Sequence, residues 1–232
     1  MFLGIDPLYW MMMAPVLLLS LWASWRVKSA FNKYSKVPSR SGITGAQAAE
    51  MILQRKGLGN IPVVETGGFL SDHYDPIKKV VRLSPDVYRS TSLASIGVAA
   101  HETGHAIQHA GRYSPLMLRN MMAPTASIGS NMAWIIIIGG FILGSMGLVK
   151  IGILIFSVVV VFQLITLPVE FNASTRAREL LSSYGIVSGA EMAGVSRVLS
   201  AAAMTYVAAA ASAVMTLLYY LIRAGILGGR DE

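Results

Sequence analysis

Four long apolar stretches constrain this chain more than any other feature of its sequence. Each holds about 20 residues, enough to cross roughly 30 Å of hydrocarbon as a helix. They lie at about residues 8–25, 126–148, 151–169 and 199–222. The chain is 54% hydrophobic and 13% charged, whereas soluble domains contain about 25% charged residues. The sequence therefore predicts a multi-pass helical membrane protein, with a tight hairpin turning near Lys150 between the second and third stretches.

Basic residues are divided unevenly between the two sides of these stretches. Of 19 Lys and Arg residues, 13 lie between the first and second stretches and three between the third and fourth; the others are Lys150, Arg223 and Arg230. Basic loops favour the cytosol, so these two segments are predicted to be cytosolic. Residues 1–10 contain no Lys or Arg, which favours an uncleaved anchor over a secretory signal. The charge of +7 therefore needs no nucleic-acid partner.

The segment of about residues 26–120 is the only one long enough for a domain outside the membrane. Thr44 followed by Gln47 forms the pattern of a capping box, which opens a helix. β-branched runs with turn-like flanks indicate strands, and a Ser-Pro-Asp sequence indicates a helix start. The predicted elements are a helix at 44–56, strands at 61–64 and 79–83, a helix start at 84–86 and a helix at 91–110.

The last of these helices carries the complete motif H-E-x-x-H. Residues four apart lie on one face of a helix, so His101 and His105 can converge on one metal ion. Glu102 lies next to the first ligand and can act as a base toward water without ligating the metal. The chain has no cysteine, which leaves histidines and carboxylates as ligands. The alternative reading is a pair of surface histidines.

A catalytic zinc site needs a third protein ligand. His109 is separated from His101 by about 12 Å of helical rise, too far for one ion. The metzincin pattern is excluded because Gln108 and Gly111 replace its glycine and histidine. Glu170 is the favoured ligand, because a carboxylate at the inner end of the third apolar stretch is costly and usually functional. The alternatives are an ion pair of Glu170 with Arg176 or Arg178, or another ligand among Glu65, Asp72, Asp75, Glu179 and Glu191.

A polar stretch just before the second strand offers a further catalytic group. Zinc peptidases place a donor where the oxyanion develops in the transition state. His73 and Tyr74 are the candidates for this role. A polar turn without a catalytic role explains the same residues equally well.

Four sequence segments together resemble the bacterial YugP-like neutral zinc metallopeptidases, over nearly the whole chain. They are Lys33–Val37, Ser71–Ser84 (in two parts around Ile77–Lys79), Ala99–Gln108 and Leu167–Ser174. The chain also resembles, more distantly, the HtpX and Ste24 membrane peptidases. The resemblance implies zinc at His101 and His105, Glu102 as base and Glu170 as third ligand. Thermolysin-type enzymes have Asp four residues after the ligand Glu, where this chain has Ser174; Asn172 is therefore expected in the orienting role.

These observations predict a mainly α, multi-pass membrane protein with about four transmembrane helices and a small cytosolic α+β zincin-like domain. The predicted parts are an anchor at 1–25, the zincin-like domain at 26–120, a helical hairpin at 121–169, a cytosolic segment with the third ligand at 170–198, and a last helix with a tail at 199–232. The predicted cofactor is one Zn²⁺ per chain.

The predicted function is zinc-dependent membrane endopeptidase, which by analogy with HtpX acts in membrane-protein quality control. The expected partners are a peptide or membrane-protein substrate and the lipid bilayer, not nucleic acid; oligomeric and regulatory partners are left open. The expected location is a bacterial plasma membrane with the site facing the cytosol. The alternative is a non-enzymatic membrane scaffold or partner-binding subunit that retains zinc. A metal transporter is disfavoured because the apolar stretches hold essentially no ionisable residues.

Overall fold

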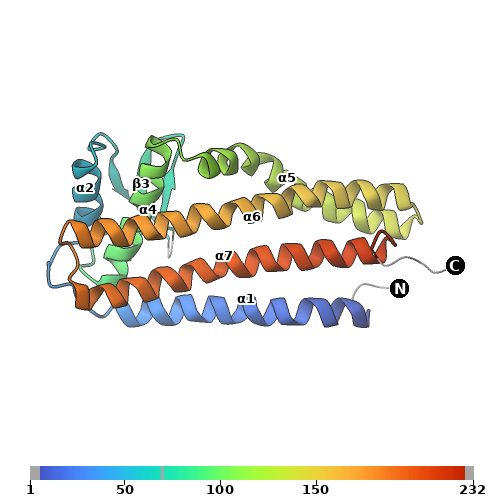
Figure 1. Ribbon diagram of the computed structural model, residues 1–232, viewed down its shortest axis with the longest axis horizontal. Coiled ribbons are helices and arrows are strands. Elements are labelled where there is room, and N and C mark those ends of the chain that lie inside the picture. The colour runs from blue at the N-terminus through green and yellow to red at the C-terminus, as the bar shows by residue number, and fades with distance from the viewer. Residues whose placement is uncertain (1–5, 69–70, 228–232) are drawn as a thin grey trace. The chain divides into compact units, whose positions relative to one another are not determined.

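The computed structural model describes residues 6–68 and 71–227, and Arg230, counted above among the basic residues, lies outside this range. Seven helices and three short strands follow one another along these residues, as coloured in Figure 1. The elements are α1 (Pro7–Tyr34), α2 (Gly45–Arg55), β1 (Val63–Glu65), β2 (His73–Asp75), β3 (Val80–Leu83), α3 (Pro85–Tyr88), α4 (Leu93–Ala110), α5 (Ser114–Ile142), α6 (Met146–Ser183) and α7 (Gly189–Arg223). The mainly helical fold class with a small sheet is confirmed.

The chain forms two compact units. The helical unit contains the described residues up to Trp22, Met117–Leu167 and the described residues from Thr205 onward. The mixed unit contains Ala23–Leu116 and Pro168–Met204. Helices α1, α5, α6 and α7 each contribute residues to both units.

Four helices among the described residues are long and apolar enough to cross a membrane, as predicted: α1, α5, α6 and α7. Large apolar side chains on these helices, such as Leu21, Ile135 and Leu154, are more than half exposed. In water such exposure would be costly, at roughly 25 cal/mol per Å² of apolar surface. In lipid the same side chains lie in a solvent as apolar as themselves.

The hairpin between α5 and α6 turns earlier than the sequence predicted. Residues 143–145 form the turn, and Gly144 adopts a φ of +65°, a left-handed conformation that favours glycine. The prediction of a turn near Lys150 was wrong, because apolar periodicity alone does not detect this local backbone requirement. Two glycines then allow the helices to lie close: Gly140 packs on Val149, and Gly152 packs on Ile137.

At the chain's start, Asp6 is tied to the last turns of α7. Its carboxylate accepts a hydrogen bond of 2.9 Å from the Tyr219 hydroxyl and lies 3.3 Å from Nε of Arg223. Asp6 is buried, and a buried carboxylate is stable only when it is paired. This pair therefore fixes α1 against α7 within the helical unit.

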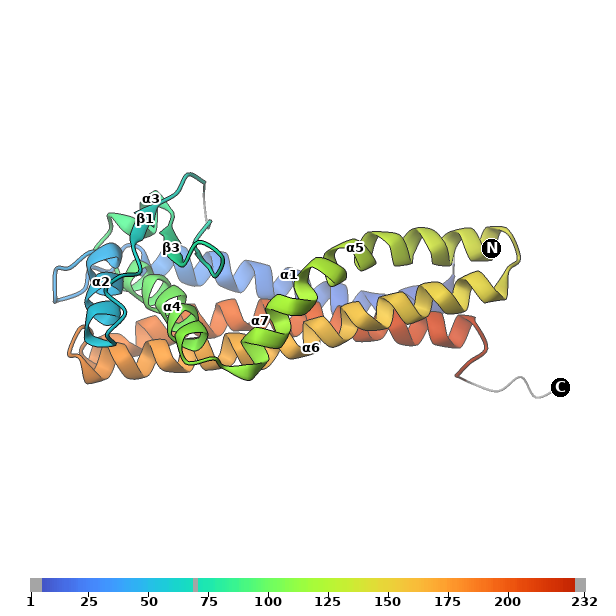
Figure 2. The same cartoon turned by 90° about the horizontal axis from the view of Figure 1, so that it is seen from above.

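The mixed unit holds a three-stranded sheet in the order β1-β3-β2, seen with α2, α3 and α4 in Figure 2. β1 is parallel to β3, and β2 is antiparallel to it. The predicted strands at 61–64 and 79–83 are present within two residues of their expected bounds. β2 was not predicted as a strand, because three largely polar residues give no alternating pattern.

Helix α4 occupies the core of the mixed unit. Ser92 caps its first turn by accepting a hydrogen bond from the Ser95 amide, and the helix prediction at 91–110 is confirmed. The predicted capping box of Thr44 and Gln47 is also present at the start of α2. Most of α4 is buried, including Ile96, Ala99, Ala100 and Ala106. Because α4 is surrounded by core, its side chains hold fixed positions.

Candidate metal centre

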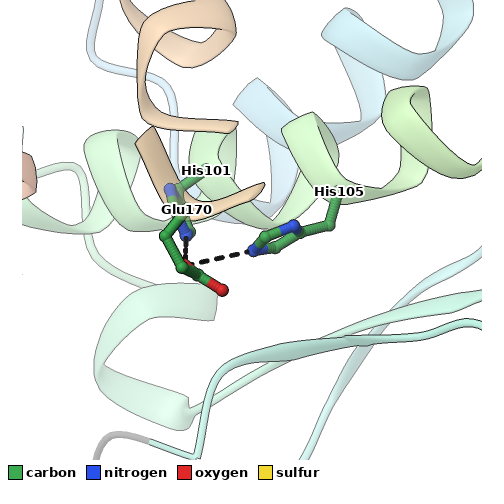
Figure 3. A group of neighbouring side chains, drawn as sticks. All are labelled: His101, His105 and Glu170. Carbon is green, nitrogen blue, oxygen red and sulfur yellow. Dashed lines mark hydrogen bonds and ion pairs between the residues drawn. The ribbon is translucent and has the colours of Figure 1, made fainter. Parts of the chain in front are cut away.

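The histidines of the H-E-x-x-H motif meet Glu170 within the mixed unit. His101 and His105 extend from successive turns of α4, and Glu170 extends from α6 (Figure 3). Nε2 of His101 lies 3.2 Å from Oε2 of Glu170, and Nε2 of His105 lies 3.5 Å from the same oxygen. Three side chains from two helices therefore direct their ligand atoms at one point.

The residues present fit a zinc ion. One ligand atom from each of the three residues can be chosen so that all lie within 4.8 Å of one another. Their side chains are 14%, 9% and 4% exposed for His101, His105 and Glu170. Two imidazole nitrogens and one carboxylate oxygen are the ligands of zinc hydrolase sites such as His₂Glu, which keep a fourth position open. The sequence-predicted triad is thus brought together.

A close approach between α4 and α6 allows this convergence. Gly104 lies between the two ligand histidines in sequence, and a Cβ atom built on it would lie 2.8 Å from the Ala173 carbonyl oxygen. Such a separation is shorter than side chains tolerate against backbone, so α6 can lie this close only to a glycine. Glu170, one turn before Ala173, therefore reaches the histidines.

Glu102 is buried beside the triad and does not belong to it. It is 8% exposed, and the metal-ligand group found among the described residues contains only His101, His105 and Glu170. Burial raises the pKa of Glu102 to about 7, and His101 opposes the shift. A carboxyl group with a pKa near neutrality can both accept and return a proton.

Both histidines of the motif have a hydrogen-bond partner at Nδ1. Ser174 Oγ lies 3.1 Å from Nδ1 of His101, and Gln108 Oε1 lies 3.0 Å from Nδ1 of His105. Asn172, which was expected in the orienting role, is not hydrogen-bonded to either histidine itself among the contacts described. Asn172 instead bonds to Gln108 and Arg176. Gln108 was missed as a partner of His105, although its position three residues after His105 on a helix was an available signal.

The two candidates for an oxyanion donor are placed differently on β2. His73 is exposed, and its Nδ1 lies 2.7 Å from the Ser71 carbonyl oxygen. Tyr74 is partly buried, and its hydroxyl lies 2.9 Å from Nδ1 of His109. Burial raises the pKa of Tyr74, which keeps the phenol protonated. The Tyr74 backbone also lies close enough to Glu102 to lower the pKa of that carboxyl, so β2 borders the site.

The carboxylates considered as other ligands have different contacts. Glu65 forms a bidentate pair with Arg89, at 2.6 and 2.9 Å. Asp72 accepts hydrogen bonds from the Ser84 amide and hydroxyl, and burial raises its pKa. Asp75 caps the turn before β3 by accepting from the amides of residues 77 and 78. Glu191 binds Ser188 and the Arg40 amide.

Comparison with known proteins agrees with this geometry. The profile of a family described as "Putative neutral zinc metallopeptidase" matches residues 9–225. The chain is 50% identical over 214 residues to a Bacillus subtilis (strain 168) protein described as "Putative membrane protease YugP", covering 92% of this chain and 94% of that protein. No solved structure matches the chain significantly. The chain therefore belongs to this family of neutral zinc metallopeptidases.

Proposed function

We propose that this protein is a membrane-bound zinc endopeptidase with one catalytic zinc held by His101, His105 and Glu170. The observation that carries the proposal is the convergence of these three side chains, two buried and that of His101 partly buried, at one point. Both histidines lie on α4, and Glu170, on α6, follows His105 by 65 residues of sequence. Family membership supports a zinc peptidase, and the geometry supports these residues as its ligands.

Glu102 is the proposed general base. Zinc, when bound, supplies a Lewis acid that acidifies water and polarises the scissile carbonyl. The Glu102 carboxylate accepts the proton of the attacking water and returns it to the leaving amine. A pKa raised by burial to about 7 suits both transfers. A purely structural zinc site has no need of such a base, which argues against the scaffold alternative.

The edge of β2 supports cleavage within an extended chain. Among the described residues β2 pairs with β3 alone, so its other edge has no strand partner. The Tyr74 backbone on that strand lowers the pKa of Glu102, which supports an edge that lies beside the proposed site. An extended peptide can add to an exposed edge through main-chain hydrogen bonds. A chain bound in this way continues past the site in both directions, as an endopeptidase requires.

We infer the side of the membrane that the site faces from the distribution of basic residues, and the role of the protein from its resemblance to HtpX. Sixteen of the 19 basic residues lie between the first and second or the third and fourth apolar stretches, which supports a cytosolic site. Substrates would then be cytosolic or membrane-proximal segments of peptides and membrane proteins. A role in membrane-protein quality control is proposed by analogy with HtpX alone.

The proposal is tested with the purified full chain in detergent or nanodiscs. Zinc content is measured by mass spectrometry, and cleavage is measured on an unfolded protein substrate whose products are identified by mass. We expect one zinc per chain and cuts inside the substrate, both lost after chelation. One zinc per chain with no cleavage of any substrate would favour the scaffold alternative. Removal of terminal residues only would contradict the endopeptidase assignment.

A further inference from the structure

His105 is held by an amide side chain from its own helix. Its Nδ1 lies 3.0 Å from Oε1 of Gln108, one turn further along α4. Gln108 is completely buried, so no solvent competes for this contact. A buried amide must satisfy its own donors and acceptor inside the protein. The partners of Gln108 therefore decide which of its atoms faces the histidine.

The partners of the Gln108 NH₂ group fix its direction. Nε2 of Gln108 lies 2.8 Å from the Val169 carbonyl oxygen and 3.0 Å from Oδ1 of Asn172. A backbone carbonyl can only accept a hydrogen bond. The atom facing Val169 must therefore be the nitrogen, and the oxygen must face His105.

Arg176 supports the same orientation of the Gln108 amide by acting on its partner, Asn172. Its Nε donates a hydrogen bond of 2.7 Å to Oδ1 of Asn172. A guanidinium has donors and no acceptor, so the Asn172 side chain must present its oxygen here. That oxygen then accepts from Gln108 as well. The hydrogen bonds run one way, from His105 to Gln108 and from Gln108 and Arg176 to Asn172.

We propose that Gln108 is a positioning residue that holds His105 as the Nδ1–H tautomer, with Asn172 and Arg176 fixing the direction of the Gln108 amide. Nε2 of His105, which faces Glu170, is then the nitrogen left for a metal ion. The inference rests on the proposed zinc centre and adds to it the residues that prepare one ligand. We call the hydrogen-bonded series His105, Gln108, Asn172 and Arg176 the relay. It differs from the carboxylate–histidine arrangement common at zinc sites, because Gln108 is neutral and adds no negative charge next to the histidine.

The second histidine has no such constraint. Nδ1 of His101 faces the Ser174 hydroxyl at 3.1 Å, and a hydroxyl can either donate or accept. The two ligands are therefore prepared differently: the tautomer of His105 is set by a directed relay, and that of His101 is free to adjust.

The test uses four variants of the full chain in detergent. Gln108→Met keeps the length of the side chain and removes both the acceptor and the donors. Arg176→Met removes the donor to Asn172. Arg178→Met is its matched control, because Arg178 is two residues away on α6 and bonds only Thr175 among the contacts described. Asn172→Asp keeps an acceptor for both donors and should preserve the relay.

Two readouts are measured on each variant. The tautomer of His105 is read from ¹⁵N chemical shifts of selectively labelled histidine in metal-free protein, with the signal assigned through His105→Asn. Zinc affinity is read by competition with a chelating dye. The first readout needs no metal, so a failure of the proposed zinc centre leaves it able to judge the relay.

We expect wild type to be protonated at Nδ1 and Gln108→Met to show a mixture of tautomers with about 10–100-fold weaker zinc binding. Arg176→Met should shift the tautomer in the same direction by less, and Arg178→Met and Asn172→Asp should match wild type. A wild-type His105 that carries its proton at Nε2 and none at Nδ1 overturns the inference. So does wild-type zinc affinity in Gln108→Met. Should Gln108→Met fail to fold, the contrast between Arg176→Met and Arg178→Met decides: equal tautomers in the two overturn the directed relay.

Discussion

Gly104 lies against the backbone of Ala173, so close that a Cβ atom on Gly104 would be 2.8 Å from the Ala173 carbonyl oxygen. The contact lies between the two ligand histidines on α4 and one turn after Glu170 on α6. Because a backbone atom is the obstacle, α6 as a whole would have to shift to admit a side chain. This glycine therefore sets the distance between the two helices that share the metal centre.

Gly104→Ala should lower the free energy of unfolding and weaken zinc binding, even though alanine favours helices. Overpacking of this kind costs about 1–3 kcal/mol. Thermal unfolding and zinc affinity of the purified protein are the measurements. Gly189→Ala is the control, because nothing lies within 4 Å of a Cβ atom there, and it should be neutral or stabilising by up to about 1 kcal/mol. Unchanged zinc affinity in Gly104→Ala would mean that the helices separate without disturbing the site.

Glu170→Ala should weaken zinc binding strongly. Mutation of a residue that only orients a metal ligand lowers metal affinity by about 10–100-fold, and the loss of Glu170 should exceed that. A ligand is removed, and the two histidines lose the carboxylate that lies 3.2 and 3.5 Å from their Nε2 atoms. Glu170→Gln should be milder for folding and still weaken zinc, since a neutral amide is a poor ligand. Zinc stoichiometry after dialysis against a mild chelator is the measurement.

His109→Ala is the matched comparison for Glu170→Ala, because His109 bonds Tyr74 and is outside the ligand group found in the described residues. It should retain zinc. The ligand set is wrong if Glu170→Ala keeps its zinc and His109→Ala loses it.

Glu102→Gln should keep zinc and lose peptide cleavage. The three ligands are untouched, while the loss of a general base commonly costs about 10²–10⁴ in rate. Turnover and zinc content are measured on the same preparation, so that the two effects are separated. Wild-type turnover in this variant would favour the scaffold alternative over the enzyme.

Tyr74 is the better of the two oxyanion-donor candidates, because it is partly buried and its backbone lies close enough to Glu102 to lower the pKa of that carboxyl. Tyr74→Phe should lower kcat by about 10²–10³, the usual cost of one such donor. His73→Asn, on an exposed side chain, should leave kcat within a few-fold. A Tyr74→Phe variant with normal kcat and lower stability would show that the hydroxyl only ties β2 to His109.

The topology proposal predicts opposite accessibility at two exposed lysines. Lys36 and Lys150 are both exposed. The proposal assigns Lys36 to the cytosol and Lys150 to the outside. The chain has no cysteine, so Lys36→Cys and Lys150→Cys each carry one thiol. In intact cells an impermeant thiol reagent should label position 150 and spare position 36. Labelling of position 36 would contradict a cytosolic site.

Much of the fold could be predicted because its causes are local. The apolar spans follow from the length and composition of each stretch, and the start of α2 follows from Thr44 and Gln47 alone. Other local features were not recognised: the turn at Gly144 was placed too late, since apolar residues continue past it. β2 was missed because it is defined by its pairing with β3 and not by its own three residues.

The sequence by itself determined that His101 and His105 share one face of a helix, with Glu102 beside them, because i and i+4 spacing is a property of the helix itself. It also selected Glu170 from the cost of a carboxylate next to hydrocarbon. Only the tertiary structure decided that Glu170 meets both histidines, that Gln108 rather than Asn172 contacts His105, and that Gly104 permits the approach. Those contacts join residues more than 60 positions apart or depend on side-chain direction in a packed core, and both are fixed only when α4 and α6 pack together.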